Sequence, residues 1–375
     1  MNKRIPILMA MVLLLVLVAV FAACNRDLEN NNASQGLEYI LNSDGNGYTV
    51  KAIGTCKDTD LKIPSSHKSK PVTAIAEKAF LECNNLTSVA FPKSVTSIGD
   101  EAFSFCTQIE SIVVEKGNAK YHSAGNCLIE TQSKTLVFGC KNSVIPTDGS
   151  VESIGRGAFS GCSHLTKTDI PNSVTSIGAG AFYYCTGLTG ATIPDSVQSI
   201  GEGAFGGCSG LTRLNIGSGV KNIGKHSFMG CSRIESISVA SNNAKYHSAG
   251  NCLIETQSKT LVFGCKNSVI PTDGRVESIA RQAFAFCTGL SDVAIPDGVT
   301  DIGDEAFREC IGLGSVTIPN SVTTIGHYAF ENCYGLKNIT FGGTMEQWNA
   351  ISKAESWSKA VQSCTVTCTD GTLEI

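Results

Sequence analysis

Residues 313–335 read LGSVTIPNSVTTIGHYAFENCYG, and this stretch predicts how most of the chain folds. Its first third places Leu313, Val316 and Ile318 among small and polar residues. The alternation around Val316 and Ile318 is typical of a short strand with one inward face. Pro319 has no backbone donor, so we expect the strand to end there.

The rest of the stretch predicts a second strand and a short arc. Val322 and Ile325 indicate the strand, and Gly326 permits a turn after it. Residues 329–330 and Cys333 then place a small, a large and a small inward side chain on a short helical or 3-10 arc. Twenty-three residues are too few for the helix pairs of longer repeats, but they suffice for one coil of a leucine-rich solenoid.

The same unit recurs along the chain at a spacing of 23 residues. Two longer gaps each equal one unit plus a 33-residue insertion. A single unit has an apolar face that only its neighbours can cover, so we expect one continuous spiral with a shared core. Nine coils at a spacing of about 4.8 Å would form a sheet roughly 40 Å long. A phenylalanine lies three residues before each repeated cysteine, and these cysteines are Cys83, Cys106, Cys162, Cys185, Cys208, Cys231, Cys287, Cys310 and Cys333.

The recurring pattern Leu-x-x-[Val/Ile]-x-Ile-Pro-x-x-Val-x-x-Ile-Gly-x-x-Ala-Phe-x-x-Cys resembles the BspA-type leucine-rich repeat, which occurs in bacterial surface proteins. The resemblance covers about residues 37–345, with the repeats at 61–335. It implies a leucine-rich repeat solenoid that is mostly β, with short strands, short helical or 3-10 arcs, and capped ends. It also implies adhesion to host matrix proteins, epithelial cells or other bacteria.

Two coils contain insertions, at residues 118–149 and 243–274, that are identical over 32 positions. Identity at polar as well as apolar positions indicates a duplication of about 125 residues rather than two matched functional sites. In each insertion two apolar runs flank a polar turn, which predicts a β-hairpin that protrudes from its coil.

The insertion cysteines are candidate disulfides, Cys127 with Cys140 and Cys252 with Cys265. A two-residue turn at residues 133–134 would place Cys127 opposite Cys140, whereas a four-residue turn over residues 131–134 would not.

The two ends of the repeat array predict caps. Residues 37–60 contain a hairpin pattern around Asp44, typical of the first segment of such proteins. Residues 336–375 depart from the 23-residue period, and residues 345–351 have helical spacing. Trp348 and Trp357 are available to cover the last open coil.

The first 36 residues predict export and anchoring. Residues 1–23 carry Lys3 and Arg4 before an apolar run, as a secretory signal does. Residues 20–24 resemble the lipobox of bacterial lipoproteins, which implies Cys24 as the lipid site and a location on the bacterial cell surface. Ordinary cleavage near Ala22 and a retained transmembrane anchor are the alternatives. Residues 24–36 are polar and fit a tether.

Charge and motifs exclude several function classes. The net charge is −4 and becomes more negative without the leader, so there is no cationic field to attract nucleic acid. We find no nucleophile elbow, phosphate-binding loop or zinc-protease motif, and we predict no enzyme activity, no cofactor and no metal. The repeated cysteines are expected to be buried free thiols. The acidic pairs at residues 100–101 and 304–305 are expected to form a solvated edge.

The outward positions of the predicted sheet are the candidate binding face. They are small and polar, with charges near the middle of the row. The expected partners are proteins or glycans on host or bacterial surfaces. A structural envelope spacer without a discrete ligand and a glycan-binding lipoprotein are the competing interpretations. Four tyrosines on the opposite arc, Tyr183, Tyr184, Tyr328 and Tyr334, are alternative contacts. The face is represented by Lys167, Asp169, Arg213, Asn215 and Asp292.

Overall fold

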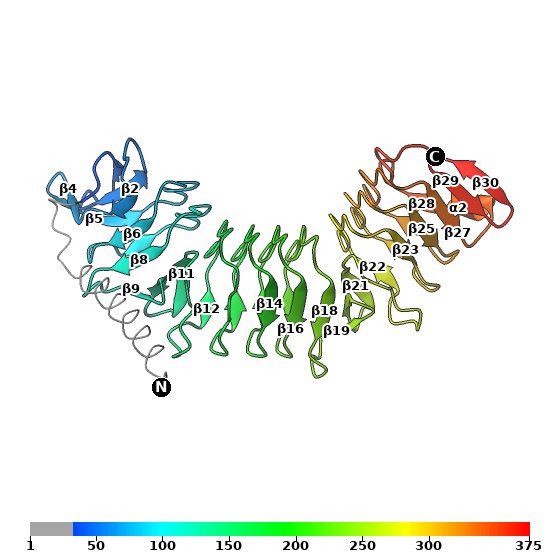
Figure 1. Ribbon diagram of the computed structural model, residues 1–375, viewed down its shortest axis with the longest axis horizontal. Helices are drawn as coiled ribbons and strands as arrows, with labels where there is room; N and C mark the ends of the chain where they lie inside the picture. Colours follow the sequence, from blue (N-terminus) through cyan, green and yellow to red (C-terminus); the bar gives the residue numbers. More distant parts are fainter. Residues whose placement is uncertain (1–32) are drawn as a thin grey trace, which may run out of the picture.

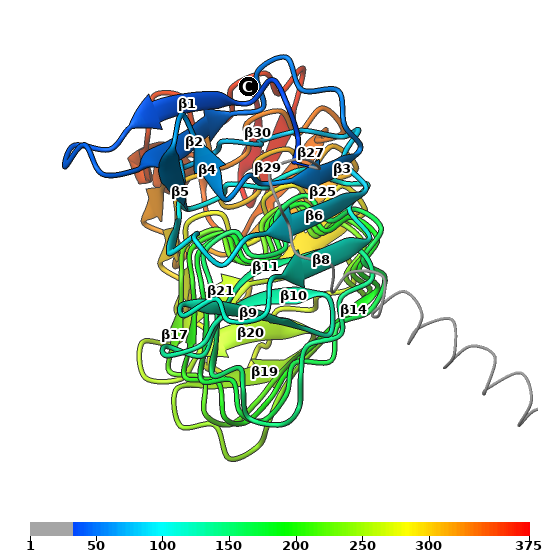
Figure 2. The same cartoon turned by 90° about the vertical axis from the view of Figure 1, so that its left-hand side faces the viewer.

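The computed structural model describes residues 33–375, which wind into a solenoid of short coils (Figure 1). The expected leucine-rich repeat architecture is confirmed, and strands dominate with very little helix. Most coils contribute one strand to each of two rows, which lie on opposite sides of the coil (Figure 2), and some coils contribute to row two only. Row one contains β3 (Asp60–Lys62), β6 (Ser88–Phe91), β8 (Ser111–Val114), β14 (Gly190–Ile193), β16 (Arg213–Ile216), β18 (Ser236–Val239), β23 (Asp292–Ala294), β25 (Ser315–Ile318), β27 (Asn338–Phe341) and β29 (Thr365–Cys368).

Row two is built from two-residue strands, which follow the turn after each row-one strand. Its regular members are β7 (Ser97–Ile98), β12 (Ser153–Ile154), β13 (Ser176–Ile177), β15 (Ser199–Ile200), β17 (Asn222–Ile223), β22 (Ser278–Ile279), β24 (Asp301–Ile302), β26 (Thr324–Ile325) and β28 (Ser352–Lys353).

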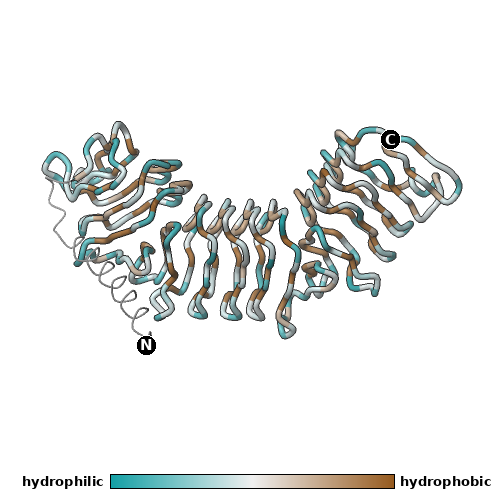
Figure 3. The backbone as a smooth tube through the Cα atoms, in the orientation of Figure 1, coloured by the Kyte–Doolittle hydropathy of each residue, from teal (hydrophilic) through white to brown (hydrophobic). Residues whose placement is uncertain are grey.

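The parallel register places equivalent residues of successive coils directly beside one another. Leu214 of β16 pairs with Ala191 of β14 and with Ile237 of β18. All three side chains are buried, so the inward face of one coil continues into the next. Hydrophobic residues accordingly occupy matching places along successive coils (Figure 3).

The phenylalanine row forms three stacks rather than one. Within a stack, rings of adjacent coils lie nearly parallel, as Phe182 and Phe205 do at 5.0 Å between ring centroids and 12° between planes. Each insertion adds a ring, Phe138 or Phe263, that ends the stack before it. The stacks are Phe80, Phe103 and Phe138; then Phe159, Phe182, Phe205, Phe228 and Phe263; then Phe284, Phe307 and Phe330.

The sequence led us to expect that the insertions protrude from their coils. They instead lie within the stack of coils. Each forms a three-stranded antiparallel meander whose last strand pairs in parallel with the next coil, β11 with β12 and β21 with β22. The meanders are β9 (Tyr121–Ala124), β10 (Cys127–Glu130) and β11 (Thr135–Gly139), and β19 (Tyr246–Ala249), β20 (Cys252–Glu255) and β21 (Thr260–Phe263).

The meanders divide the molecule at two places, which we call the first and second joints. The expected continuous row-one sheet is therefore wrong: the row separates into sheets β3-β6-β8, β14-β16-β18 and β23-β25-β27-β29-β30. The buried residues likewise fall into three clusters. The run of coils changes direction at each joint, which gives the molecule its arched outline (Figure 1).

A glycine in each meander fits it against the following coil. A Cβ atom added to Gly139 would lie 2.0 Å from Cε1 of Phe159, and one added to Gly264 would lie 2.0 Å from Cε1 of Phe284. Neither glycine has a positive φ angle, so the close approach of the ring is what requires glycine there.

At each joint, one row-two strand lies at the edge of its sheet. β17 pairs with β15 but not with β21, and β7 pairs with β5 (Lys70–Ile75) but not with β11. A buried tyrosine of the meander lies near each of these strands. Burial raises the pKa of Tyr121 and of Tyr246, and the nearby backbone of Ile98 or Ile223 partly opposes that rise.

Both ends of the solenoid are closed by other elements. At the N-terminal end β1 (Glu38–Leu41) and β2 (Tyr48–Ala52) pair antiparallel across a turn that contains Asp44, and β4 (Ser66–His67) pairs with β5. At the C-terminal end α2 (Met345–Ala350) begins with a capping box at Thr344, and β30 (Gly371–Glu374) pairs with β29. Trp348 and Trp357 are buried there, as predicted, and Trp357 lies edge-on to Phe330 at 5.9 Å.

Cys24 and the proposed leader lie outside the described residues. Within residues 33–375, no helix has the length and apolar character needed to cross a membrane.

Candidate functional site

The central row-one sheet carries an open concavity of about 980 Å³. Lys167, Asp169, Arg213 and Asn215 line it, so the structure brings together four of the five residues of the expected binding face. Asp292 does not belong to this group, because it lies on β23 in the next sheet, beyond the second joint.

Two of the four residues are placed differently from the prediction. Lys167 and Asp169 are exposed but lie on an irregular segment beside β14, not on a strand. They form an ion pair of 3.1 Å in which both side chains remain more than three-quarters exposed. Such a pair contributes little to stability because water screens it. It leaves a charged but locally neutral margin to the concavity.

A polar ladder crosses the three strands of the concavity. Asn215 donates a hydrogen bond to Oγ1 of Thr192 at 3.3 Å and accepts one from Oγ of Ser238 at 2.7 Å. Arg213 is exposed, and its side chain makes no hydrogen bond or ion pair with any other residue of the described chain. The guanidinium group is therefore free to contact a partner with up to five N–H donors.

The repeated cysteines are buried free thiols, apart from Cys83, which is partly exposed. Most of them donate a hydrogen bond to a carbonyl of the previous coil, as Cys208 does to Phe182. Burial raises the pKa of Cys208 to about 12, so the thiolate needed for nucleophilic attack or metal binding is not populated near neutral pH. The thiols serve as small core side chains with a weak donor.

The candidate disulfides of the two insertions do not form in the structure, where all four cysteines are free. The turn of the first hairpin spans residues 131–134, and Cys127 lies opposite Gly139 rather than Cys140. Cys127 packs in the middle buried cluster, whereas Cys140 packs in the N-terminal one. Cys252 and Cys265 repeat this arrangement at the second joint and are also free.

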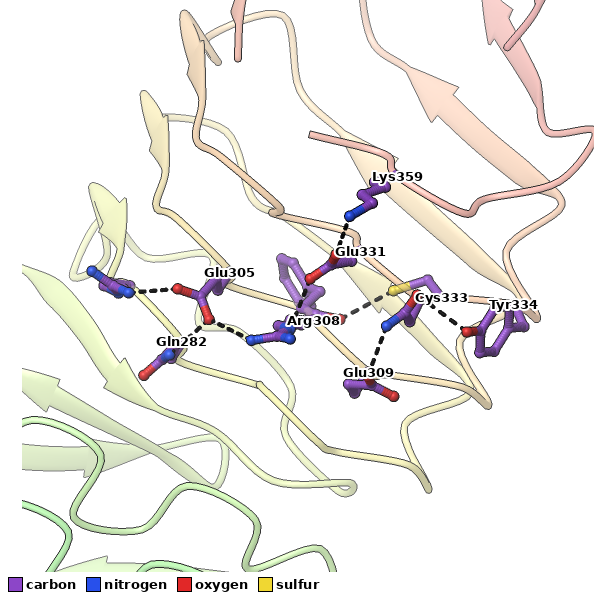
Figure 4. Close-up of polar contacts among 11 residues, drawn as sticks. Gln282, Glu305, Arg308, Glu309, Glu331, Cys333, Tyr334 and Lys359 are labelled. Atoms are coloured by element: carbon purple, nitrogen blue, oxygen red, sulfur yellow. Dashed lines mark hydrogen bonds and ion pairs between the residues drawn. The ribbon is translucent and has the colours of Figure 1, made fainter. Parts of the chain in front are cut away.

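The acidic pair at residues 304–305 does not form the solvated edge that the sequence led us to expect. Glu305 is buried and lies between Gln282 and Arg308 (Figure 4). Burial by itself would raise its pKa, but hydrogen bonds from Gln282, Arg308 and Arg281 outweigh burial and lower the pKa. Arg308 continues to Glu331 at 2.8 Å, so the residues form a ladder of ion pairs across coils.

The candidate tyrosines lie in two places. Tyr183 and Tyr184 are in contact at 4.6 Å between ring centroids, and Phe105 lies 6.1 Å from Tyr184. Tyr328 lies under the ammonium group of Lys359, and the hydroxyl of Tyr334 donates to Asn332. No group of three or more potential metal ligands gathers anywhere from residue 33 onward.

Two pockets that we did not predict lie at equivalent positions of the two joints. The first joint pocket has a volume of about 230 Å³ and the second joint pocket about 240 Å³. A shift of about 125 residues, the length of the duplication, brings most of their lining residues into correspondence. The duplication in the sequence could therefore have indicated that the two pockets are related. Equivalent lining residues are Asp100 and Lys225, Glu101 and His226, Phe103 and Phe228, Phe138 and Phe263, Arg156 and Arg281, and Gly157 and Gln282.

Comparisons with solved structures identify other leucine-rich repeat proteins. A leucine rich cell surface protein from Faecalibacterium prausnitzii A2-165 is 26% identical, with 85% of this chain and 96% of that chain covered and a TM-score of 0.45. The pneumococcal vaccine antigen PcpA is 20% identical over 83% of this chain and 81% of that chain, with a TM-score of 0.51, and shares the fold. A leucine-rich repeat protein from Bacteroides ovatus is 20% identical over 88% and 98%, with a TM-score of 0.39. No curated protein matches the sequence at a significant level.

Sequence comparison with protein families agrees with the repeat pattern. The family described as the BspA type leucine rich repeat region matches residues 51–144, 137–252 and 258–360, which together make up most of the chain. The phenylalanine stacks and the cysteine ladder are the structural counterparts of that pattern. The chain therefore belongs to the BspA-type leucine-rich repeat family.

Proposed function

We propose that this chain is a surface-exposed binding protein that uses the central row-one sheet to hold a macromolecular partner in adhesion. The main support is the concavity over β14, β16 and β18, where charged and amide side chains project from a surface of otherwise small residues. Arg213 is unpaired there, and arginine is enriched at the energetic centres of protein interfaces. Membership of a family of repeat scaffolds supports binding rather than catalysis.

The proposed partners are proteins of the host matrix, of epithelial cells or of other bacteria. A long, shallow and polar face suits a protein surface better than a small molecule, because small ligands bind in enclosed and mostly apolar pockets. The polar ladder of Thr192, Asn215 and Ser238 offers donors and acceptors spaced by the strands.

The test uses residues 25–375, which contain the whole described fold, applied to immobilised matrix proteins. A variant in which Lys167, Asp169, Arg213 and Asn215 are all changed to alanine should lose saturable binding. The matched control carries Asp292→Ala and Asn338→Ala, two exposed positions on the third sheet, and should bind as the wild type does. Absence of binding to a broad panel would favour the role of an envelope spacer.

The proposal includes export and anchoring by a lipid on Cys24, after removal of residues 1–23. The sequence of residues 20–24 supports this location. Radiolabelled palmitate should enter the wild type but not the Cys24→Ala variant, and the variant should be released from the membrane fraction. Equal labelling of both proteins would contradict lipid attachment.

A further inference from the structure

The two joints share one backbone arrangement and one pair of packed phenylalanine rings, but the second joint pocket has the more apolar lining. The insertions that form them are identical in sequence, and each packs a meander phenylalanine against the last ring of the preceding coil. At the second joint, Phe228 and Phe263 are buried and lie 5.5 Å apart, with their planes tilted by 42°. The second joint pocket lies beside these rings, and Ile223, Met229 and Val262 also line it.

The residues around the two pockets differ in charge. Asp100 and Glu101 of the first joint pocket are replaced by Lys225 and His226 in the second. The two carboxylates face two cationic groups, because Arg156 lies 3.0 Å from Glu101 and 4.0 Å from Asp100, and Lys78 lies 3.6 Å from Glu101. The acidic side chains of the first joint pocket are therefore paired with basic side chains of the same chain.

The second joint pocket has one cationic group without a partner in the described chain, Lys225, and a second, Arg281, that is only partly engaged. The ammonium group of Lys225 has no hydrogen bond or ion pair there, and His226 lies 3.7 Å from the mostly exposed Glu202. Arg281 contacts Glu305 through one amino group at 2.5 Å, which leaves other N–H donors available. Glu305 also receives Gln282 and Arg308 (Figure 4).

We infer that the second joint pocket is a binding site for an acidic peptide segment, in which an apolar side chain enters the pocket and a neighbouring carboxylate meets Lys225, His226 and Arg281. The volume of about 240 Å³ is below the roughly 300–1,000 Å³ of pockets for drug-sized ligands, so it suits a single side chain. The carboxylate and the cationic groups form charge-assisted hydrogen bonds at the rim.

The apolar interior is the reason for choosing a peptide over an acidic sugar. A sugar in contact with Phe228, Phe263 and Val262 would lose water from hydroxyl groups that find no partner on those side chains. An aromatic or aliphatic side chain has no such cost there. This site lies on the row-two side of the coil, away from the proposed adhesive face. The inference about this site is therefore independent of the proposed function.

The test is a nuclear magnetic resonance titration of residues 25–375 with the dipeptide acetyl-Phe-Glu-amide. Its neutral isostere acetyl-Phe-Gln-amide and the acidic sugar glucuronate are the comparison probes. The wild type should bind acetyl-Phe-Glu-amide at one site and bind the neutral isostere at least roughly tenfold more weakly, as expected for loss of a charge-assisted contact. Equal binding of the two peptides, or tighter binding of glucuronate, would overturn the inference.

The duplication supplies matched variants in both directions. Lys225→Asp combined with His226→Glu gives the second joint the residues of the first and should abolish binding. Asp100→Lys combined with Glu101→His does the reverse and should create a second site, so that two peptides bind per chain. A gain of a site cannot result from misfolding. Unchanged affinity in the first variant, together with unchanged stoichiometry in the second, would refute the site.

Discussion

The thiol of Cys208 donates a hydrogen bond to the backbone carbonyl of Phe182, at 3.0 Å and one coil earlier in the chain. The same carbonyl accepts the backbone N–H of Cys185, so the thiol adds a second donor to a group that is already paired. The relationship recurs through Cys106, Cys185, Cys231, Cys310 and Cys333. It ties neighbouring coils together with a side chain small enough for the arc.

The native thiols should differ sharply in reactivity. Burial raises the pKa of both thiols, but Cys83 is partly exposed, whereas Cys208 is buried with a pKa raised to about 12. Because the thiolate is the reactive form, iodoacetamide at pH 8 should label Cys83 first and leave the ladder thiols unmodified until the protein unfolds. Mass spectrometry of tryptic peptides measures this. The Cys83→Ser variant should lose the fast phase, and rapid labelling of Cys208 in native protein would contradict the buried ladder.

Truncation of a stacked ring should strongly destabilise the protein. Phe205 is fully buried, with ring centroids of Phe182 at 5.0 Å and Phe228 at 5.8 Å. The Phe205→Ala variant should lose about 3–5 kcal/mol of unfolding free energy, since a cavity replaces the ring. Urea denaturation measures the change. The exposed control Lys221→Ala should change it by less than about 0.5 kcal/mol, and a loss under about 1 kcal/mol for Phe205→Ala would mean that the row is not core.

A methyl group at the joint should be costly for steric reasons alone. The Cβ atom of a Gly139→Ala variant would lie 2.0 Å from the Phe159 ring, so the ring or the meander must move. We expect a loss of about 1–3 kcal/mol, the usual cost of overpacking. Gly264→Ala should behave alike against Phe284. Gly190→Ala is the control because a Cβ atom there meets nothing within 4 Å, and thermal unfolding of the three variants should separate it from the other two.

The carboxylate of Glu255 in the second meander should make the stability of the protein depend on pH. Hydrogen bonds from Lys245 and then Ser258 lower the pKa of Glu255 from its ordinary value of 4.5 to about 2. A carboxyl group with a lowered folded-state pKa stabilises the protein above the unfolded value and loses that contribution as the pH falls through the folded value. The melting temperatures of the wild type and Glu255→Gln should therefore differ most above about pH 5 and converge towards pH 2.

The partner side of this ion pair provides the control for the acid prediction. Lys245→Gln removes the ammonium group that lies 2.6 Å from Glu255, so it should show the same convergence at low pH. The double variant should add little to either single change because both remove one interaction. A melting-temperature difference that stays constant from pH 7 to pH 2 would show that the pair does not depend on ionisation.

The placement of the binding-face residues shows how far a local pattern can reach. Alternation in residues 213–216 correctly predicts that Arg213 and Asn215 point outward from a strand, because the strand period depends on local geometry. The same alternation at Lys167 and Asp169 gives outward side chains but no strand. Whether a segment joins a sheet depends on the neighbouring coil, and no local pattern contains that information.

The joints show the same limit on a larger scale. The apolar runs of residues 126–140 predict a hairpin, and β10 and β11 form one. The position of the hairpin in the stack of coils depends on contacts with the following coil, such as the contact of Gly139 with Phe159. The turn length and the bulge between Leu128 and Ile129 then fix the register that keeps Cys127 from facing Cys140.

By itself the sequence determined the coil. A 23-residue recurrence of Phe and Cys requires equivalent side chains to stack, since only adjacent coils can cover each unit's apolar face. The tertiary structure alone decided where the stack is divided, which sheet each exposed residue joins, and that two identical insertions enclose pockets whose rims differ in charge. The physical reason is that packing between coils joins residues distant in sequence, whereas periodicity reports only which way each side chain points.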